Sequence, residues 1–271
     1  MPFAVTSAGR VFYEQRGSSG LPVVLLHATL HDHRDFDLVV GPLAERYRTI
    51  AVDWPGHGQS DPEGQAVDAF LLAKVLAELV ESLDLPPAVL IGNSVGGFAA
   101  ARLAVDQPHR VAGLVLVNTA GFTVPTAESH LAIRLLGSPR VSRLLLPRLV
   151  PGYMKAQNSH DRAIAKSVQA RARTVDGARV AASLWRSFGA RGFDLRADGY
   201  RLGPPTLLVW GARDIILPLK AGRQTHAAIP GSQFHALDTG HVVFASDPDG
   251  FLDLAMPFIA SACAGRNGAA A

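Results

Sequence analysis

Three polar residues with the side chains of a hydrolytic site follow strand-like segments of the sequence. Ser94 lies inside a G-x-S-x-G segment, between an apolar run of strand length and a helical segment. Asp214 and His241 each come just after a later apolar run of strand length. A serine hydroxyl becomes an effective nucleophile when a histidine takes its proton and a carboxylate orients that histidine. The sequence therefore predicts Ser94 as the nucleophile, His241 as the base and Asp214 as the orienting acid.

The two glycines of the G-x-S-x-G segment have a steric role. A serine on a very tight strand-to-helix turn is forced to positive φ, which projects its hydroxyl above the sheet. This turn brings the residues two before and two after the serine almost into contact, so both must lack side chains. Gly92 and Gly96 meet that condition. The pentapeptide alone also fits a glycine-rich turn with an incidental serine, so the assignment depends on the other residues.

Strand-like and helical segments alternate along most of the chain, which predicts the elements that position these residues. The expected strands are residues 11–16, as an antiparallel edge strand, and 22–27, 49–53, 88–92, 111–118, 205–210 and 232–237. The expected helices are residues 34–47, 67–83, 95–106, 218–228 and 242–262. This alternation predicts an α/β fold with a mostly parallel central sheet flanked by helices. All three candidate residues then lie at the carboxyl ends of strands, where open α/β sheets place their sites.

The alternation is interrupted by a segment in which no strand is expected. Its helical patterns cover residues 127–149, 153–173 and 174–188. We therefore divide the chain into a core, residues 1–121 and 201–271, and an all-helical insert, residues 122–200.

The insert differs from the core in charge. It holds 13 Lys and Arg against 5 Asp and Glu, a net charge of +8, whereas the whole chain carries +3. The arginines are scattered and have no interleaved aromatic residues, so a solvated helical surface is favoured over a nucleic-acid site. A preference for an anionic substrate is the alternative.

Composition excludes several classes of protein. With 271 residues, of which 48% are hydrophobic and 18% charged, the chain can bury a large core and is not intrinsically disordered. No apolar run approaches the roughly 18 to 20 residues of a membrane span, and the N-terminal residues have no secretory-signal pattern. Cys263 is the single cysteine, which excludes an internal disulfide. We expect a cytoplasmic protein.

Several further segments occur in a characteristic order. They are the D-x-x-G-x-G-x-S segment of residues 53–60, the segment 204–214, which ends at Asp214, and Gly240-His241 followed by residues 247–251. Together with the G-x-S-x-G segment, they make the whole chain resemble the α/β-hydrolase superfamily. The resemblance implies an α/β-hydrolase fold in which the insert is a helical cap over the active site. It also implies the same three catalytic roles, with Asn118 at the position where some members carry the acid.

The resemblance further implies an oxyanion hole made of two backbone N–H groups. One belongs to Val95, directly after the nucleophile, and the other to Thr29, in the loop after His27. The family usually has glycine after this histidine, whereas this chain has Ala28. If that position requires positive φ, Ala28 is strained and the loop adopts a modified geometry. By the same resemblance, Asp53 and His57 have structural roles in their loop.

The loop after His27 contains several potential metal ligands. His31, Asp32 and His33 are close in sequence, and a His-x-His pattern with a carboxylate can bind zinc. No cysteine or second cluster supports this interpretation, and a serine–histidine–aspartate mechanism needs no metal. We therefore expect no metal and no cofactor, and we expect these side chains to make polar contacts or to line the pocket.

The serine decides which hydrolase reaction is expected. Haloalkane dehalogenases and epoxide hydrolases, which share this core, use an aspartate at the same position, so an acyl-enzyme route on Ser94 is favoured. We expect hydrolysis of a small or medium, fairly apolar carboxylic ester, lactone or thioester. Carbon–carbon hydrolysis of a meta-cleavage diketone is an alternative, although those enzymes carry Trp where this chain has Val242. A slow-turnover ligand-binding receptor on the same fold is the non-enzymatic alternative.

The substrate pocket can be predicted only from position along the chain. We expect a small-molecule substrate as partner, without nucleic acid or membrane, and a monomer or homodimer. The residues expected to contact the substrate are Leu30, Phe122, Trp185 and Val242.

Overall fold

A single eight-stranded sheet forms the centre of the protein, for which the computed structural model describes residues 2–61 and 66–267. The strand order is β1-β2-β4-β3-β5-β6-β7-β8; β1 and β2 run antiparallel to their neighbours and the others are parallel. The strands are β1 (Phe3–Thr6), β2 (Gly9–Arg16), β3 (Pro22–Leu26), β4 (Arg48–Val52), β5 (Ala88–Asn93), β6 (Val111–Val117), β7 (Thr206–Gly211) and β8 (Gln233–Leu237).

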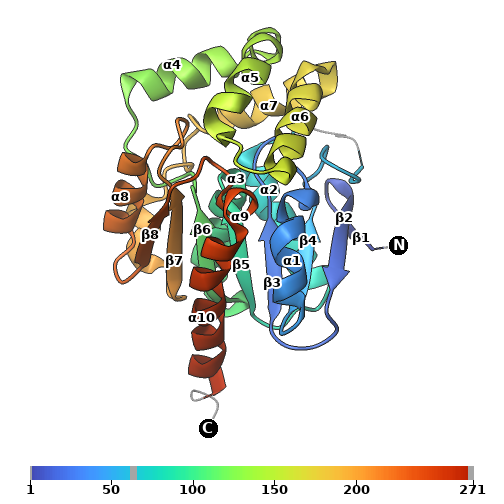
Figure 1. The fold of residues 1–271 in the computed structure, drawn as a ribbon, viewed down its shortest axis with the longest axis vertical. Coiled ribbons are helices and arrows are strands. Elements are labelled where there is room, and N and C mark those ends of the chain that lie inside the picture. The colour runs from blue at the N-terminus through green and yellow to red at the C-terminus, as the bar shows by residue number, and fades with distance from the viewer. Residues whose placement is uncertain (1, 62–65, 268–271) are drawn as a thin grey trace.

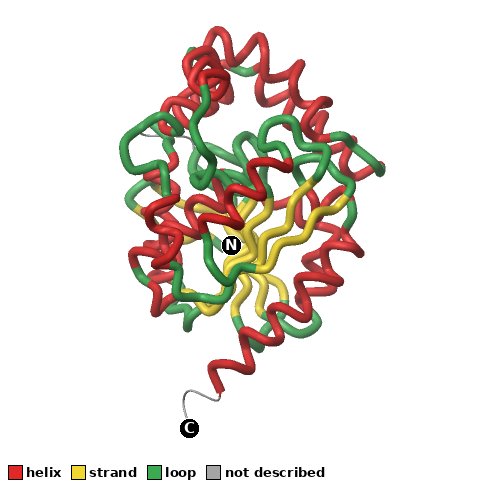
Figure 2. The backbone as a smooth tube through the Cα atoms, turned by 90° about the vertical axis from the view of Figure 1, so that its left-hand side faces the viewer, coloured by secondary structure: helices red, strands yellow, loops and turns green. Residues whose placement is uncertain are grey.

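Helices cover both faces of this sheet, as the near-continuous apolar strands require. Every residue of β3, β5, β6 and β7 is buried. One face packs against α2 (Ala69–Ser82), α3 (Val95–Asp106) and α8 (Leu219–Ala228), and the other against α1 (Asp37–Ala44), α9 (Val243–Ser246) and α10 (Pro248–Asn267). Figure 2 shows the twisted sheet between these layers. The predicted α/β fold with a mostly parallel sheet is confirmed.

Four helices follow β6 and precede β7, and in Figure 1 they lie together above one end of the sheet. They are α4 (Ala127–Leu136), α5 (Pro139–Met154), α6 (Ser159–Arg173) and α7 (Val175–Ser187). The backbone N–H of Leu195 donates to the carbonyl of Gly121 over 2.6 Å, so the chain returns to the core beside the point where it left. Short 3₁₀ turns at His33–Phe36, Pro108–Arg110 and Arg196–Arg201 complete the described elements.

The structure differs from the expected elements in several places: β1 is an additional strand, the expected helix 34–47 is a 3₁₀ turn followed by α1, and the expected helix 153–173 begins at Ser159. The strand of residues 11–16 is not at the edge, because β1 pairs with its outer side. The expected helix 127–149 is two helices, since Gly137-Ser138 ends α4 and Pro139 begins α5. The expected last helix is also divided, because Asp247, which precedes Pro248, takes a non-helical conformation.

Among the described residues, we find no helix with the length and apolarity to cross a membrane.

Candidate active site

Ser94 occupies a strained turn between β5 and α3. Its φ is 56° and its ψ is −116°, a conformation that costs a non-glycine residue about 1–3 kcal/mol. A Cβ atom on Gly92 would lie 2.6 Å from the carbonyl oxygen of Gly96, and one on Gly96 would collide with the backbone of Leu26. Both positions therefore require glycine, as the sequence predicts.

The backbone of Ser94 is fixed on both sides. Its N–H donates to the carbonyl of Val117 over 3.0 Å, and its own carbonyl accepts from Phe98 and Ala120, each over 3.1 Å. Val95 is the first residue of α3, and the first N–H groups of a helix have no acceptor within it. The partial positive charge of this helix end favours an anion beside Ser94.

Asp214 and His241 form a buried pair at the ends of two neighbouring strands, β7 and β8. Asp214 Oδ2 lies 2.6 Å from His241 Nδ1, and the two residues are 3% and 4% exposed. The short contact assigns the Nδ1 proton to the bond with the carboxylate, which leaves Nε2 as the acceptor. The sequence places these residues 27 positions apart, and parallel pairing of the strands brings them together.

Two further groups hold the Asp214 carboxylate. Asn118 Nδ2 donates to Oδ2 over 2.7 Å, and the N–H of Ile216 donates to Oδ1 over 2.8 Å. Asn118 is itself fixed, because its Oδ1 accepts from the N–H of Gly211 over 2.8 Å. The residue at the alternative acid position is thus an amide that orients the carboxylate.

In the loop after β3, Ala28 is not the residue with the strained backbone conformation. Ala28 is not among the residues with positive φ; Leu30 is, with a φ of 68°. The N–H of Leu30 donates to His57 Nε2 over 3.1 Å, so it is committed to the core. The N–H of Thr29 has no such bond among the described residues, and Thr29 lines the same cavity as Ser94.

His57 and His27 fix this loop and the loop after β4 by accepting backbone N–H groups. His57 accepts the Leu30 N–H at Nε2 while its Nδ1 lies 2.9 Å from the carbonyl of Pro55. His27 accepts the N–H of Trp54 at Nε2 over 3.0 Å. Burial lowers the pKa of both histidines, that of His57 well below its ordinary value, so both act as neutral acceptors.

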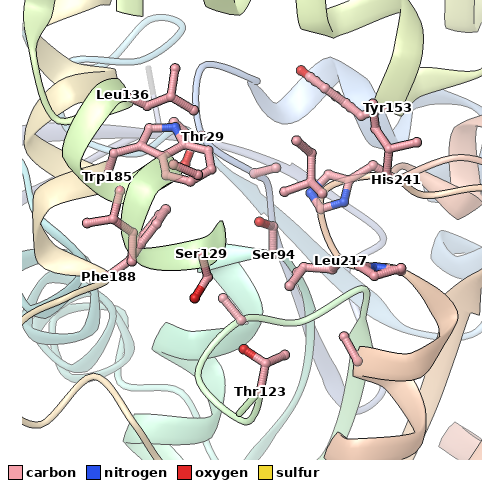
Figure 3. A pocket seen from close by; sticks show the side chains of 18 of the residues that line it. Thr29, Ser94, Thr123, Ser129, Leu136, Tyr153, Trp185, Phe188, Leu217 and His241 are labelled. Carbon is pink, nitrogen blue, oxygen red and sulfur yellow. The ribbon is translucent and has the colours of Figure 1, made fainter. Parts of the chain in front are cut away.

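A cavity of about 510 Å³ lies above Ser94 and His241, between the core and the helical insert. Figure 3 shows Ser94 at its centre, with His241 and Tyr153 on one side and Trp185 and Phe188 on the other. Most of its wall is apolar, a property typical of small-molecule sites. The apolar side chains contributed by the insert are Val124, Ala132, Ile133, Leu136, Leu146, Leu149, Val150, Val168, Trp185, Phe188 and Phe193.

The structure places the four residues expected to contact the substrate in two groups. Leu30 and Trp185 line the cavity. Phe122 and Val242 do not, and the expectation for both is wrong: each is fully buried in a hydrophobic cluster, Phe122 on the α2–α3 face and Val242 beside α9 and α10. Val242 follows His241 directly, and while the imidazole lines the cavity the valine side chain packs into the core.

The potential metal ligands of the loop are held by protein partners. Asp32 accepts from Arg34, and Asp53 lies 2.9 Å from His33 Nδ1. Asp32, His33 and Asp53 offer ligand atoms within 4.8 Å of one another, but each of these groups already has a hydrogen-bond partner. Asp53 also accepts from the N–H of Gln59, so it joins the two loops.

Sequence reasoning missed Tyr153 altogether. It is the last residue but one of α5 in the insert. Its ring packs edge-to-face on His241 with centroids 5.6 Å apart, and its carbonyl accepts the His241 N–H over 2.9 Å. No motif marks this tyrosine, because its contact depends on how the insert docks on the core.

A mostly parallel sheet with a strained serine at the carboxyl end of a central strand defines an α/β scaffold of the hydrolase class. A family model described as the alpha/beta hydrolase fold matches residues 22–248. The chain therefore belongs to the α/β hydrolase fold family.

Individual relatives are similar over nearly the whole chain. The 2-hydroxy-6-oxononadienedioate/2-hydroxy-6-oxononatrienedioate hydrolase of Escherichia coli is 28% identical over 281 residues, covering 93% of this chain and 91% of that protein. The enol-lactonase of Burkholderia xenovorans superposes with a TM-score of 0.82 at 21% identity, covering 96% and 100% of the two chains. A thermophilic esterase of Thermogutta terrifontis gives 0.81 at 24% identity, covering 96% and 98%. The two structures show likeness of fold.

Proposed function

We propose that the protein is a serine hydrolase that cleaves a small or medium, fairly apolar carboxylic ester, lactone or thioester. Ser94 is the nucleophile, His241 the general base and acid, and Asp214 the residue that orients His241. The observation that carries the proposal is the buried Asp214–His241 pair, 2.6 Å apart, at the cavity into which the strained Ser94 turn projects.

The reaction follows from these positions. His241 Nε2 takes the Ser94 proton as Oγ attacks the carbonyl carbon, and Asp214 stabilises the imidazolium through Nδ1. The carbonyl oxygen becomes negative beside the N–H groups of Val95 and Thr29; removal of one such donor typically costs about 3 kcal/mol. The imidazolium then protonates the leaving oxygen or sulfur, and its bond to carbon breaks to leave an acyl-enzyme on Ser94. Water activated by His241 releases the acid.

The insert, residues 122–200, acts as the cap in this proposal. Its leucines, valines and aromatic rings cover the cavity, so the acyl part of the substrate is buried in apolar surroundings. We propose a neutral, largely apolar acyl group, because none of the 13 Lys and Arg residues of the insert lines the cavity. The charged side chains of the wall are one of each sign, Glu128 of the insert and Lys220 of the core.

Fluorophosphonate labelling of the intact protein tests the site. We expect covalent labelling at Ser94 and loss of both labelling and ester turnover in Ser94→Ala. Labelling at another serine would overturn the assignment. A series of p-nitrophenyl esters of increasing acyl length then measures the pocket, with a fall in kcat/KM where the chain exceeds the cavity.

Carbon–carbon hydrolysis is the second candidate, supported by the similarity to the Escherichia coli hydrolase. The distinguishing experiment offers a ring-fission diketone and simple aryl esters to the same preparation. Cleavage of the esters alone supports the first proposal, and faster turnover of the diketone supports the second. Binding of ligands without turnover of either would indicate the slow-turnover receptor.

A further inference from the structure

A second chain of carboxylate, imidazole and hydroxyl lies beside the proposed catalytic one. Asp35 Oδ2 is 2.7 Å from His31 Nδ1, and His31 Nε2 is 3.2 Å from the hydroxyl of Tyr153. The His31 and Asp35 side chains are only 1% and 3% exposed. Burial of such a pair costs free energy, because both groups lose their hydration.

This chain of side chains joins two parts of the molecule, the core and the insert. Asp35 and His31 belong to the core loop that carries Thr29, and the N–H of His31 donates to the carbonyl of Ala28 over 3.2 Å. Tyr153 belongs to α5 of the insert. The hydroxyl of Tyr153 therefore connects the insert to the loop that carries the proposed oxyanion donor.

The same tyrosine also holds His241. Its carbonyl accepts the His241 N–H over 2.9 Å, and its ring packs edge-to-face on the imidazole. Gly240 makes this approach possible, since a Cβ atom there would collide with the carbonyls of Tyr153 and Met154. The end of α5 thus rests directly on the backbone that carries the proposed base.

The surroundings of the Tyr153 hydroxyl keep it protonated, as a neutral phenol. Its burial, and then the negative charges of Asp35 and Asp214, raise the pKa of Tyr153 far above its ordinary value. The phenol can therefore donate to His31 Nε2, and the Asp35 carboxylate lies within ion-pair distance of His31 Nδ1 on the other side of the ring.

We propose that Tyr153 is a positioning residue for His241, an inference that rests on the proposed function. The hydrogen bond to His31 holds Tyr153 in place, and Asp35 orients His31. The insert then does more than shape the pocket: its α5 end fixes the proposed base and the Thr29 loop relative to each other. A displacement of about 1 Å in such a group can cost about 100-fold in rate.

The test is a double-mutant cycle on the full-length protein with an aryl ester that the wild type hydrolyses. Tyr153→Phe keeps the ring and the backbone carbonyl but removes the hydroxyl, and Asp35→Asn removes the carboxylate. We expect each variant to lower kcat by about tenfold with KM changed less than about threefold, and to slow fluorophosphonate labelling in parallel. In the double variant we expect no further loss, because both changes interrupt one chain.

Two control variants separate positioning from general loosening. Tyr47→Phe removes the hydroxyl of another buried tyrosine, away from the cavity lining. Gln157→Ala removes a different bond between insert and core, the 2.6 Å contact of Gln157 Nε2 with the carbonyl of Asp238. Both are expected to keep kcat within about twofold of the wild type.

The outcomes are distinct. Unchanged kcat in Tyr153→Phe, or losses that multiply in the double variant, would overturn the positioning role while leaving the proposed function intact. A higher KM and a lower thermal stability with kcat unchanged would mean that Asp35, His31 and Tyr153 only hold the insert on the core. That result would also overturn the positioning role. If the wild type hydrolyses no ester and its Ser94 is not labelled, the proposed function fails instead. Where Asp35→Asn does not fold, His31→Gln replaces it in the cycle.

Discussion

Exchanging the carboxylate and the amide of the Asp214–Asn118 pair tests the electrostatic role of Asp214. The two side chains touch, with Asn118 Nδ2 2.7 Å from Asp214 Oδ2, and both are buried. Asp214→Asn alone removes the negative charge beside His241. The double variant Asp214→Asn, Asn118→Asp keeps one carboxylate and one amide in the pair but moves the charge one position away from the imidazole.

The distances give the expected magnitude. In the wild type the charge is 2.6 Å from His241 Nδ1; in the double variant it is at most about 5.3 Å away, the sum of the two contacts. With an effective dielectric constant of about 20, attraction to the imidazolium falls from about 6 to about 3 kcal/mol. Since 1.4 kcal/mol corresponds to tenfold in rate, we expect the double variant to be about 100-fold slower than the wild type.

The assay is kcat/KM for an aryl ester at pH 8. A charge-free Asp214→Asn variant is expected to lose about 10⁴-fold, by analogy with the serine-protease case. The relocated charge should therefore restore activity by at least about tenfold over that single variant. Activity of the double variant equal to or below that of Asp214→Asn, with the protein folded, would refute the electrostatic reasoning.

Three other changes have expected outcomes. In the proposed mechanism Thr29 acts through its backbone N–H, and its hydroxyl is buried without a hydrogen-bond partner among the described residues, so Thr29→Val should keep kcat/KM within about threefold of the wild type. A larger loss of kcat/KM in Thr29→Val would contradict a role limited to the backbone. Gly92→Ala places a Cβ 2.6 Å from the Gly96 carbonyl, and we expect lower thermal stability and no Ser94 labelling; wild-type labelling would show that the turn can adapt. Burial lowers the pKa of His57 in the folded protein, so below about pH 6.5 the unfolded state binds a proton that the folded state does not. The free energy of unfolding therefore falls as the pH drops below about 6.5, by up to about 1.4 kcal/mol per pH unit for this group. Urea unfolding at pH 7.5 and 5.5 should show a shallower decline for His57→Gln, and an equal decline would argue against a neutral His57.

Local sequence signals predicted the core of the fold well. The helix of residues 95–106 was expected with the bounds that α3 has, because a glycine-flanked turn and a Gln-Pro boundary mark its two ends. The buried strands were found because β3, β5, β6 and β7 are apolar throughout. Their carboxyl ends follow from parallel pairing, so the proximity of Asp214 and His241 could also be anticipated.

Contacts between distant segments could not be read in this way. Tyr153 meets His31 across 122 positions, and nothing in its local sequence indicates which side of α5 faces the core. Phe122 has the residue type of a pocket wall and stands at the start of the insert, yet it packs in the core. In the loop after β3 the residue with positive φ is Leu30 rather than Ala28, and its N–H is bonded to His57 Nε2, which lies 27 positions further along the chain.

The bond between Leu195 and Gly121 has a consequence for how this protein can be altered or can diverge. The polypeptide leaves and rejoins the sheet at a narrow neck, and the strands on either side, β6 and β7, are already paired with each other. The helices beyond the neck can therefore be exchanged without changing strand register, as long as Tyr153 of α5 is kept against His241. A chimera carrying another family member's helices should retain slow amide hydrogen exchange in β6 and β7 while acquiring a different range of substrates.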